Sequence, residues 1–193
     1  GLQQKDLLNA DFENAIESMD GVTGTKRWYY TDAEYRVNDY DDNWIYGLAK
    51  EDVSALKENL IAGTVDYHEL VSKNGIILIQ DTAENLSLSA QLGDSVEVDF
   101  LTKSGKTISK SYTIMGIVSN FSHPAFNMCF AMPEELMNEA CEMDCSGTIS
   151  VITEAEKADT VEASLNKLID ENSDLVMDTI EKSITYYSRN QQL

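Results

Sequence analysis

Ser95-Val96-Glu97-Val98-Asp99-Phe100-Leu101 is the stretch that decides the fold, because apolar and polar side chains alternate along it. Successive side chains of a strand point to opposite faces of a sheet, so this alternation predicts a half-buried strand. Ser104-Gly105-Lys106 predicts a hairpin turn, and residues 107–118 return as a second strand with their apolar side chains on one face. The middle of the chain is therefore predicted to form a compact β-rich module.

Towards the N-terminus, helical and strand patterns alternate. The continuous apolar run Gly75–Ile79 predicts a buried strand, and residues 81–88 predict a helix with Asp81 or Thr82 as its N-cap. Earlier in the chain the patterns predict, in order, a helix over 5–19, a strand over 21–30 continued by 35–37, a polar turn or loop over 38–43, a strand over 44–48 and a helix over 51–60.

The last third of the chain also alternates. The patterns predict a strand over 127–132, a helix that starts at Pro133, a strand over 147–152, a helix over 154–170, a strand over 175–177 and a terminal helix from Thr179. Nothing caps that last helix, and the chain opens without Met, so we expect a fragment cut from a longer protein.

The charge of the chain excludes two classes of partner. Its 193 residues include 34 acidic and 14 basic side chains, which gives a formal charge of −20. Such a chain repels nucleic-acid phosphates and anionic lipid headgroups. No apolar stretch approaches the roughly 20 residues that a membrane-spanning helix needs, while a hydrophobic fraction of 42% is ordinary for a globular protein.

The cysteines do not predict a disulfide framework. Three are present, Cys129, Cys141 and Cys145, and an odd number argues against a fold that depends on disulfides. Cys141 and Cys145 lie four residues apart, which leaves a local pair open, and the sequence does not decide their redox state. Neither a Cys-x-x-Cys motif nor a cluster of histidines predicts a zinc site.

No motif predicts catalysis, a cofactor or a metal. Asp39-x-Asp41-x-Asn43 resembles the start of an EF-hand loop, but Trp44 and Lys50 stand where Gly and Glu are required, so only a looser cation site remains open. His123 precedes a proline and has no nucleophile motif beside it. We therefore predict a protein that is not an enzyme; the competing hydrolase hypothesis needs a polar cluster in a pocket.

Tyr40 and Trp44 are the candidate partner-contact residues. Tyr40 lies within the polar segment 38–43, and Trp44 directly follows it. Aromatic side chains exposed in such a segment are typical of binding surfaces. The alternative is that both pack into the core with the other aromatic residues of the first quarter of the chain.

Several short motifs occur in a particular order. A helix ends Met19-Asp20-Gly21-Val22, and a second helix ends Leu60-Ile61-Ala62-Gly63. Then follow the apolar strand 74–79, the triplet Leu92-Gly93-Asp94 and the strand 112–118. In this order the motifs resemble the extracytoplasmic domain of FtsX-like and MacB-like ABC transporter permeases, from about residue 10 to residue 185.

The resemblance implies a two-lobed α+β domain on the extracellular face of the cell membrane. A mixed α/β Porter-like lobe would comprise residues 1–62 and 125–193, and a β-rich Sabre-like lobe would be the insertion 63–124. Transmembrane helices of the same permease, a cytoplasmic ATPase subunit and a dimeric transporter are the implied partners. The chain departs from periplasmic MacB members in lacking a long outer-lobe insertion, so a Gram-positive permease fits better than one that docks a periplasmic adaptor.

The functional hypothesis is a non-catalytic permease domain that transmits motion or captures a substrate such as a peptide, an antimicrobial or a lipid-linked molecule. The acidic charge adds a cationic peptide as a partner. The alternative is a free-standing secreted binding or adhesion module. The sequence names no substrate and no oligomeric state.

Overall fold

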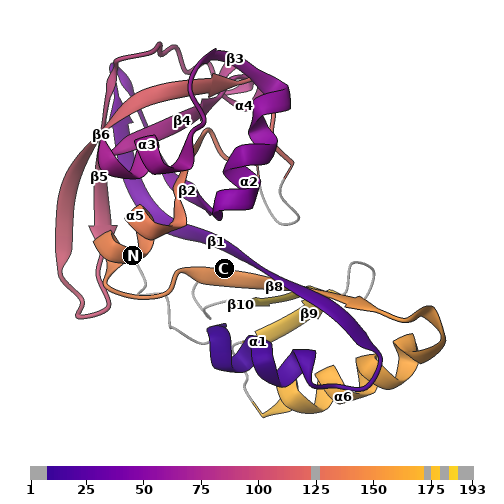
Figure 1. Ribbon diagram of the computed structural model, residues 1–193. Coiled ribbons are helices and arrows are strands. Elements are labelled where there is room, and N and C mark those ends of the chain that lie inside the picture. Colours follow the sequence, from indigo (N-terminus) through magenta and orange to yellow (C-terminus); the bar gives the residue numbers. More distant parts are fainter. Residues whose placement is uncertain (1–7, 123–126, 172–174, 179–182, 187–193) are drawn as a thin grey trace. The chain divides into compact units, whose positions relative to one another are not determined.

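The computed structural model describes residues 8–122 and 127–171, together with the backbone of strands β9 (Leu175–Asp178) and β10 (Ser183–Tyr186) (Figure 1). The chain divides into two compact units. The larger unit spans Tyr30–Cys145, and the smaller unit combines the chain on either side of it. The mixed α+β class predicted from the sequence is confirmed.

These units divide the chain at points other than the predicted lobe boundaries. The predicted insertion, residues 63–124, lies wholly inside the larger unit. The reason is that Tyr46–Leu48 pairs in parallel with Ala131–Pro133, which holds both flanks of the predicted insertion in one unit. The assignment of Porter-like and Sabre-like lobes stays a prediction.

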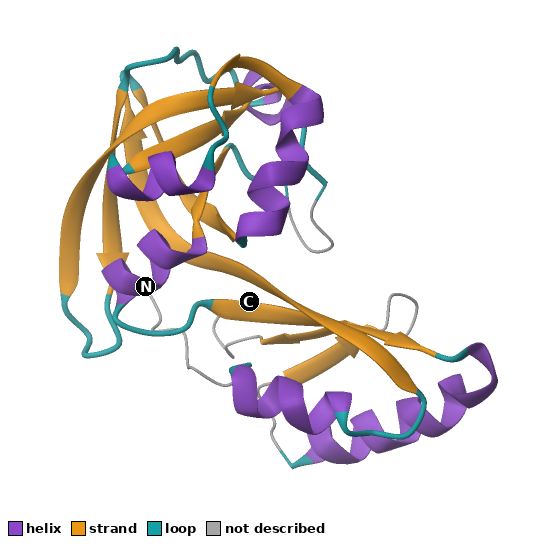
Figure 2. Cartoon of the chain, in the orientation of Figure 1, coloured by secondary structure: helices purple, strands orange, loops and turns teal. Residues whose placement is uncertain are grey.

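The smaller unit is an antiparallel sheet with two helices on one side of it (Figure 2). The strand order is β1-β8-β10-β9, where the first part of β1 (Val22–Val37) pairs with β8 (Ser146–Thr153). The helices are α1 (Ala10–Glu17) and α6 (Ala158–Asp170), the second preceded by the short η2 (Ala155–Lys157). Their apolar faces meet β8 in a core of Leu8, Ile16, Ile149, Val151, Val161 and Leu165.

The terminal helix predicted from Thr179 is wrong over the residues that the structure describes. Ser183–Tyr186 forms strand β10, which lies between β8 and β9 and pairs with both in antiparallel fashion. Ile184, Thr185 and Tyr186 are residue types that favour strands. Pairing with β8 on one side and β9 on the other makes this segment a strand instead of the predicted helix. The rest of the predicted helix, residues 179–182 and 187–193, lies outside the described residues.

Strand pairings in the larger unit run in a closed circuit. β1 pairs with β5, β5 with β6, β6 with β4, β4 with β7, β7 with β2, and β2 with β1 again. A short additional strand, β3, pairs with β6. The strands are β2 (Tyr40–Leu48), β3 (Leu60–Gly63), β4 (Gly75–Ile79), β5 (Ser95–Leu101), β6 (Thr107–Val118) and β7 (Phe130–Pro133). The predicted strands 75–79, 95–101 and 107–118 are thereby confirmed.

Short helices pack on this set of strands. They are α2 (Lys50–Ala55), η1 (Leu56–Asn59), α3 (Tyr67–Ser72), α4 (Gln80–Asn85) and α5 (Glu134–Cys141). Val53, Leu56 and Leu70 extend from them into the same core as Ile77 and Ile79 of β4. All five residues of β4 are buried, which explains why its sequence is continuously apolar rather than alternating.

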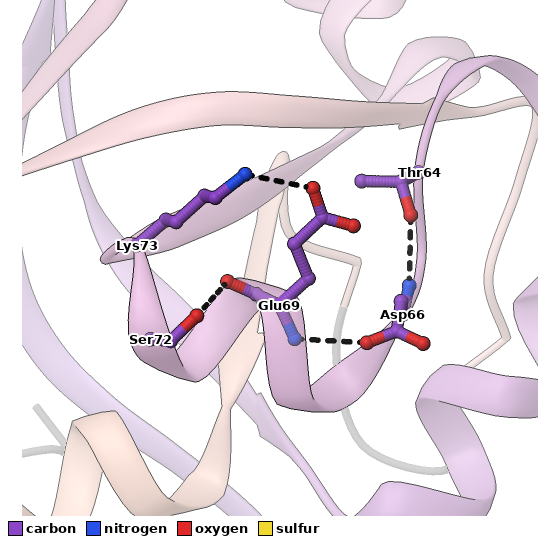
Figure 3. A network of polar contacts seen from close by, with 5 residues as sticks. All are labelled: Thr64, Asp66, Glu69, Ser72 and Lys73. Atoms are coloured by element: carbon purple, nitrogen blue, oxygen red, sulfur yellow. Dashed lines mark hydrogen bonds and ion pairs between the residues drawn. The ribbon is translucent and has the colours of Figure 1, made fainter.

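Helix α3, which the sequence patterns do not predict, is only six residues long and begins at a polar cap (Figure 3). The Asp66 side chain accepts a 2.8 Å hydrogen bond from the Glu69 N–H, and the Thr64 hydroxyl accepts one of 3.1 Å from the Asp66 N–H. Lys73 then forms an ion pair of 3.1 Å with Glu69 across one turn. These local bonds satisfy backbone groups at the start of a helix too short for a periodic apolar pattern.

Three further expectations need correction. The segment 38–43 is not a loop: the turn is confined to Asn38-Asp39, and Asp41–Asn43 belongs to β2. Helix α4 has Ile79 at its N-cap position rather than Asp81 or Thr82. Pro133 is the N-cap residue of α5 rather than its first helical residue.

Candidate partner-contact site on the β1–β2 hairpin

The turn that joins β1 to β2 is held by one side chain. Asn38 has a left-handed backbone (φ 53°), a conformation that asparagine tolerates better than most residues. Its amide donates hydrogen bonds of 3.1 Å to the Ser89 carbonyl and to Asp94 Oδ2. The Gln91 N–H and the Asn38 amide together hold the pKa of Asp94 below its ordinary value. The tip of the hairpin is therefore fastened to the segment 89–94.

Beside the turn, the two strands form a hollow of about 330 Å³. It is lined by Glu34, Tyr35, Arg36, Asp41, Asp42 and Asn43. The only cation of this lining, Arg36, is already matched by Asp99 of β5 through a 2.9 Å ion pair. The hydrogen bonds from Arg36 and Ser109 lower the pKa of Asp99. The carboxylates of the lining thus give the hollow a negative character at neutral pH.

Hydrogen bonds hold two of the lining residues, Asp42 and Asn43, in place. Its Oδ2 accepts a 2.7 Å hydrogen bond from the Tyr40 hydroxyl, and its Oδ1 accepts one of 2.8 Å from the Asn43 N–H. The Asn43 amide in turn donates a 2.8 Å bond to Asp32 of β1. The Asn43–Asp32 bond connects the two strands, and the two bonds within β2 fix the position of the Asp42 carboxylate.

The two predicted contact residues lie at either end of the acidic segment of β2, and both are half-buried. Burial, followed by the bond to Asp42, raises the pKa of Tyr40. Trp44 has a left-handed backbone (φ 75°), which is unusual for a bulky residue, and its ring lies 6.2 Å from that of Tyr30 against the core of the larger unit. The structure therefore gives each aromatic side chain a packed side and an exposed side, and their contact with a partner stays a prediction.

The hollow does not have the donor set of a metal centre. Among the described residues, no group of three or more His, Cys, Asp or Glu side chains is placed to hold a metal ion. Asn43, one member of the EF-hand-like pattern, uses its amide on Asp32. His123 lies outside the described residues.

Sequence reasoning missed most of the lining. Glu34 and Arg36 alternate with the buried Tyr35 on β1, so they share the exposed face of that strand. Asp41 and Asp42 fall in the segment predicted as a loop. The alternation on β1 is present in the sequence, but only the pairing of β1 with β2 shows that the two sets of residues lie together.

No protein-family profile and no curated protein matches the sequence. Solved structures do match. One is the extracellular domain of the noncanonical ABC-type transporter YknZ from Gram-positive bacteria, which aligns over 90% of this chain and 86% of its own, with a TM-score of 0.50 and 15% sequence identity. The chain has the fold of the YknZ extracellular domain.

A second match is the periplasmic region of MacB from Actinobacillus actinomycetemcomitans, which covers 99% of this chain and 83% of its own at 13% identity, with a TM-score of 0.47. The YknZ-like fold confirms the architecture that the ordered motifs implied. In the described part of the chain, no helix combines the length and the apolar character needed to cross a membrane.

Proposed function

We propose that this chain is the extracellular domain of an ABC transporter permease and that it carries no catalytic step of its own. The observation that supports this most is the YknZ-like fold, which extends over nearly the whole chain rather than over one motif. ATP hydrolysis would then belong to a separate cytoplasmic subunit or domain. The charge of −20 agrees with this location, because basic residues are concentrated on the cytoplasmic side of membrane proteins.

The gene that encodes the chain provides a first test. A permease domain of this kind lies between transmembrane helices, so we expect segments of about 20 apolar residues to be encoded on both sides of residues 1–193. A stop codon directly after residue 193 would instead favour the free-standing secreted module.

Within this function, we propose that the hollow of the hairpin captures cationic peptides, with Tyr40 and Trp44 contacting the bound chain. Glu34, Asp41 and Asp42 supply negative charge, and the exposed sides of the two rings can cover apolar parts of a peptide. Dimerisation in the intact transporter and transmission of motion belong to the same proposal.

Calorimetric titration with an octa-arginine peptide tests the capture step. We expect binding at about 20 mM salt that weakens strongly at about 500 mM, where the Debye length is only a few Å. Asp41→Asn removes an exposed charge of the hollow and is expected to weaken binding by up to about fivefold, the effect of one exposed ion pair.

Asp159→Asn is the matched control, since it removes an exposed carboxylate from α6 in the other unit. Binding that both substitutions weaken equally would show a general charge effect rather than capture at the hairpin. An absence of binding at low salt would remove the peptide from the proposal.

A further inference from the structure

The chain turns back on itself at the end of α5. Cys141 is the last residue of the helix, and Glu142 then adopts a left-handed conformation (φ 56°). Asn138 fastens the returning segment, because its carbonyl accepts a 3.2 Å bond from the Met143 N–H and its side chain accepts one of 2.8 Å from the Cys145 N–H. Asn138 and Cys141 are three residues apart on one helix and share a face. The turn therefore brings Cys145 back beside Cys141.

Both cysteine side chains are buried. Cys141 is 1% exposed and Cys145 is fully buried. A hydrogen bond links the Cys141 and Cys145 side chains, and the Cys145 Sγ also lies 3.8 Å from the Met143 carbonyl oxygen. Cys129, just before β7, has a different neighbour, because it shares a hydrogen bond with Tyr35. The structure thus separates one pair of thiols from a single thiol.

Of the two cysteines, Cys141 has the surroundings that favour its thiolate form. Hydrogen bonds from the Cys145 thiol and from Thr31 lower the pKa of Cys141, although burial acts in the opposite direction. The thiolate is the attacking form in disulfide exchange, so a lowered pKa favours Cys141 as the nucleophile.

We propose that Cys141 and Cys145 form a reversible disulfide that ties the last turn of α5 to the residue directly before β8. The oxidant is a disulfide R–S–S–R, either a small molecule or a thiol oxidoreductase. The Cys141 thiolate attacks one of its sulfurs and releases the first RS⁻; Cys145 then attacks the Cys141 sulfur of the mixed disulfide and releases the second. The two cysteines lose two electrons and two protons, and two RSH are formed.

This inference goes beyond the proposed function and does not depend on it. An extracellular location would supply the oxidising surroundings in which disulfides persist. Cys145 is the last residue of the larger unit, and β8 begins at the next residue. The bond would therefore fix the point at which the chain leaves that unit.

The test uses the purified 193-residue chain. One sample is incubated with oxidised glutathione and another with dithiothreitol; both are freed of reagent, denatured and alkylated with N-ethylmaleimide for mass measurement. The reduced chain should take up three maleimides, and the oxidised chain one, on Cys129. Closing a loop this short should also raise the Tm of the oxidised chain by about 4 to 8 °C.

Cys129→Ser is the control variant, and its oxidised form should take up none while its reduced form takes up two. Three maleimides on the oxidised wild-type chain, a bond that includes Cys129, or glutathione left on Cys141 without ring closure would each overturn the proposal. A lower Tm after oxidation would do the same, because it would show that the native geometry does not fit the bond. If Cys129→Ser does not fold, the wild-type masses and Tm decide alone.

Discussion

Gly63→Ala is expected to lower the free energy of unfolding of the larger unit by about 3 to 5 kcal/mol. Gly63 ends β3 with a positive φ of 77°, and a Cβ at this position would lie 2.1 Å from the Met115 carbonyl oxygen of β6. The backbone of β6 cannot withdraw easily, because Met115 also accepts a 2.9 Å hydrogen bond from the Thr64 N–H. The left-handed conformation and the collision both add to the cost.

Gly93→Ala separates these two contributions. Gly93 has a similar φ of 89°, but no atom lies within 4 Å of the Cβ that alanine would add. Its expected loss is about 1 to 2 kcal/mol, from backbone conformation alone. Urea unfolding followed by circular dichroism measures both variants. Equal losses would contradict the close packing of β3 on β6, whereas a Gly63→Ala chain with no cooperative transition would agree with it.

The local sequence predicts the strands whose apolar side chains follow a clear pattern, either alternating or continuous. Residues 95–101 alternate because one face of β5 is buried, and residues 75–79 are apolar throughout because β4 is buried on both faces. Gly116 interrupts the pattern of β6, and a glycine inside a strand predicts a close approach or a bulge. The structure confirms the close approach, since a Cβ there would lie 2.3 Å from the Thr64 carbonyl oxygen.

The elements that sequence reasoning missed depend on distant partners. The local pattern of β3 resembles the end of a helix, and only its pairing with β6 makes Leu60–Gly63 a strand. For β10, the helix predicted from Thr179 is wrong because Ser183–Tyr186 pairs with β8 and β9 on either side. The parallel pair of β2 and β7, which holds residues 46–48 beside 131–133, joins segments far apart in the sequence and leaves no local pattern.

The candidate site, like the fold, could be predicted from the sequence only in part. Tyr40 and Trp44 could be selected from the sequence because they flank an acidic segment. Their partial burial could not be predicted, because it accompanies contacts of the folded chain: the bond from Tyr40 to Asp42 and the packing of Trp44 against Tyr30. The negative hollow requires β1 to lie beside β2, which is a property of the folded chain.

Ser104→Cys places a reactive group on the surface of a domain that we expect to face the outside of the cell. Ser104 is exposed in the hairpin between β5 and β6, next to Gly105, where a Cβ would have no atom within 4 Å. The substitution replaces the Ser104 hydroxyl, which lies 3.0 Å from the Thr102 hydroxyl, but the Thr102 hydroxyl still accepts a 3.2 Å bond from the Lys106 N–H, which holds the turn. The three native cysteines are buried and the new thiol is exposed, so we expect a short labelling reaction to modify the new thiol much faster than the native ones.

Labelling of this cysteine in the full-length protein, on intact cells and with a maleimide that does not cross membranes, tests the extracellular location most directly. The unsubstituted protein serves as background, and a cytoplasmic protein of the same cells reports leakage. We expect Ser104→Cys to be labelled as fully on intact cells as after lysis. Labelling that appears only after lysis would place the domain inside the cell and contradict its assignment as the extracellular part of a permease.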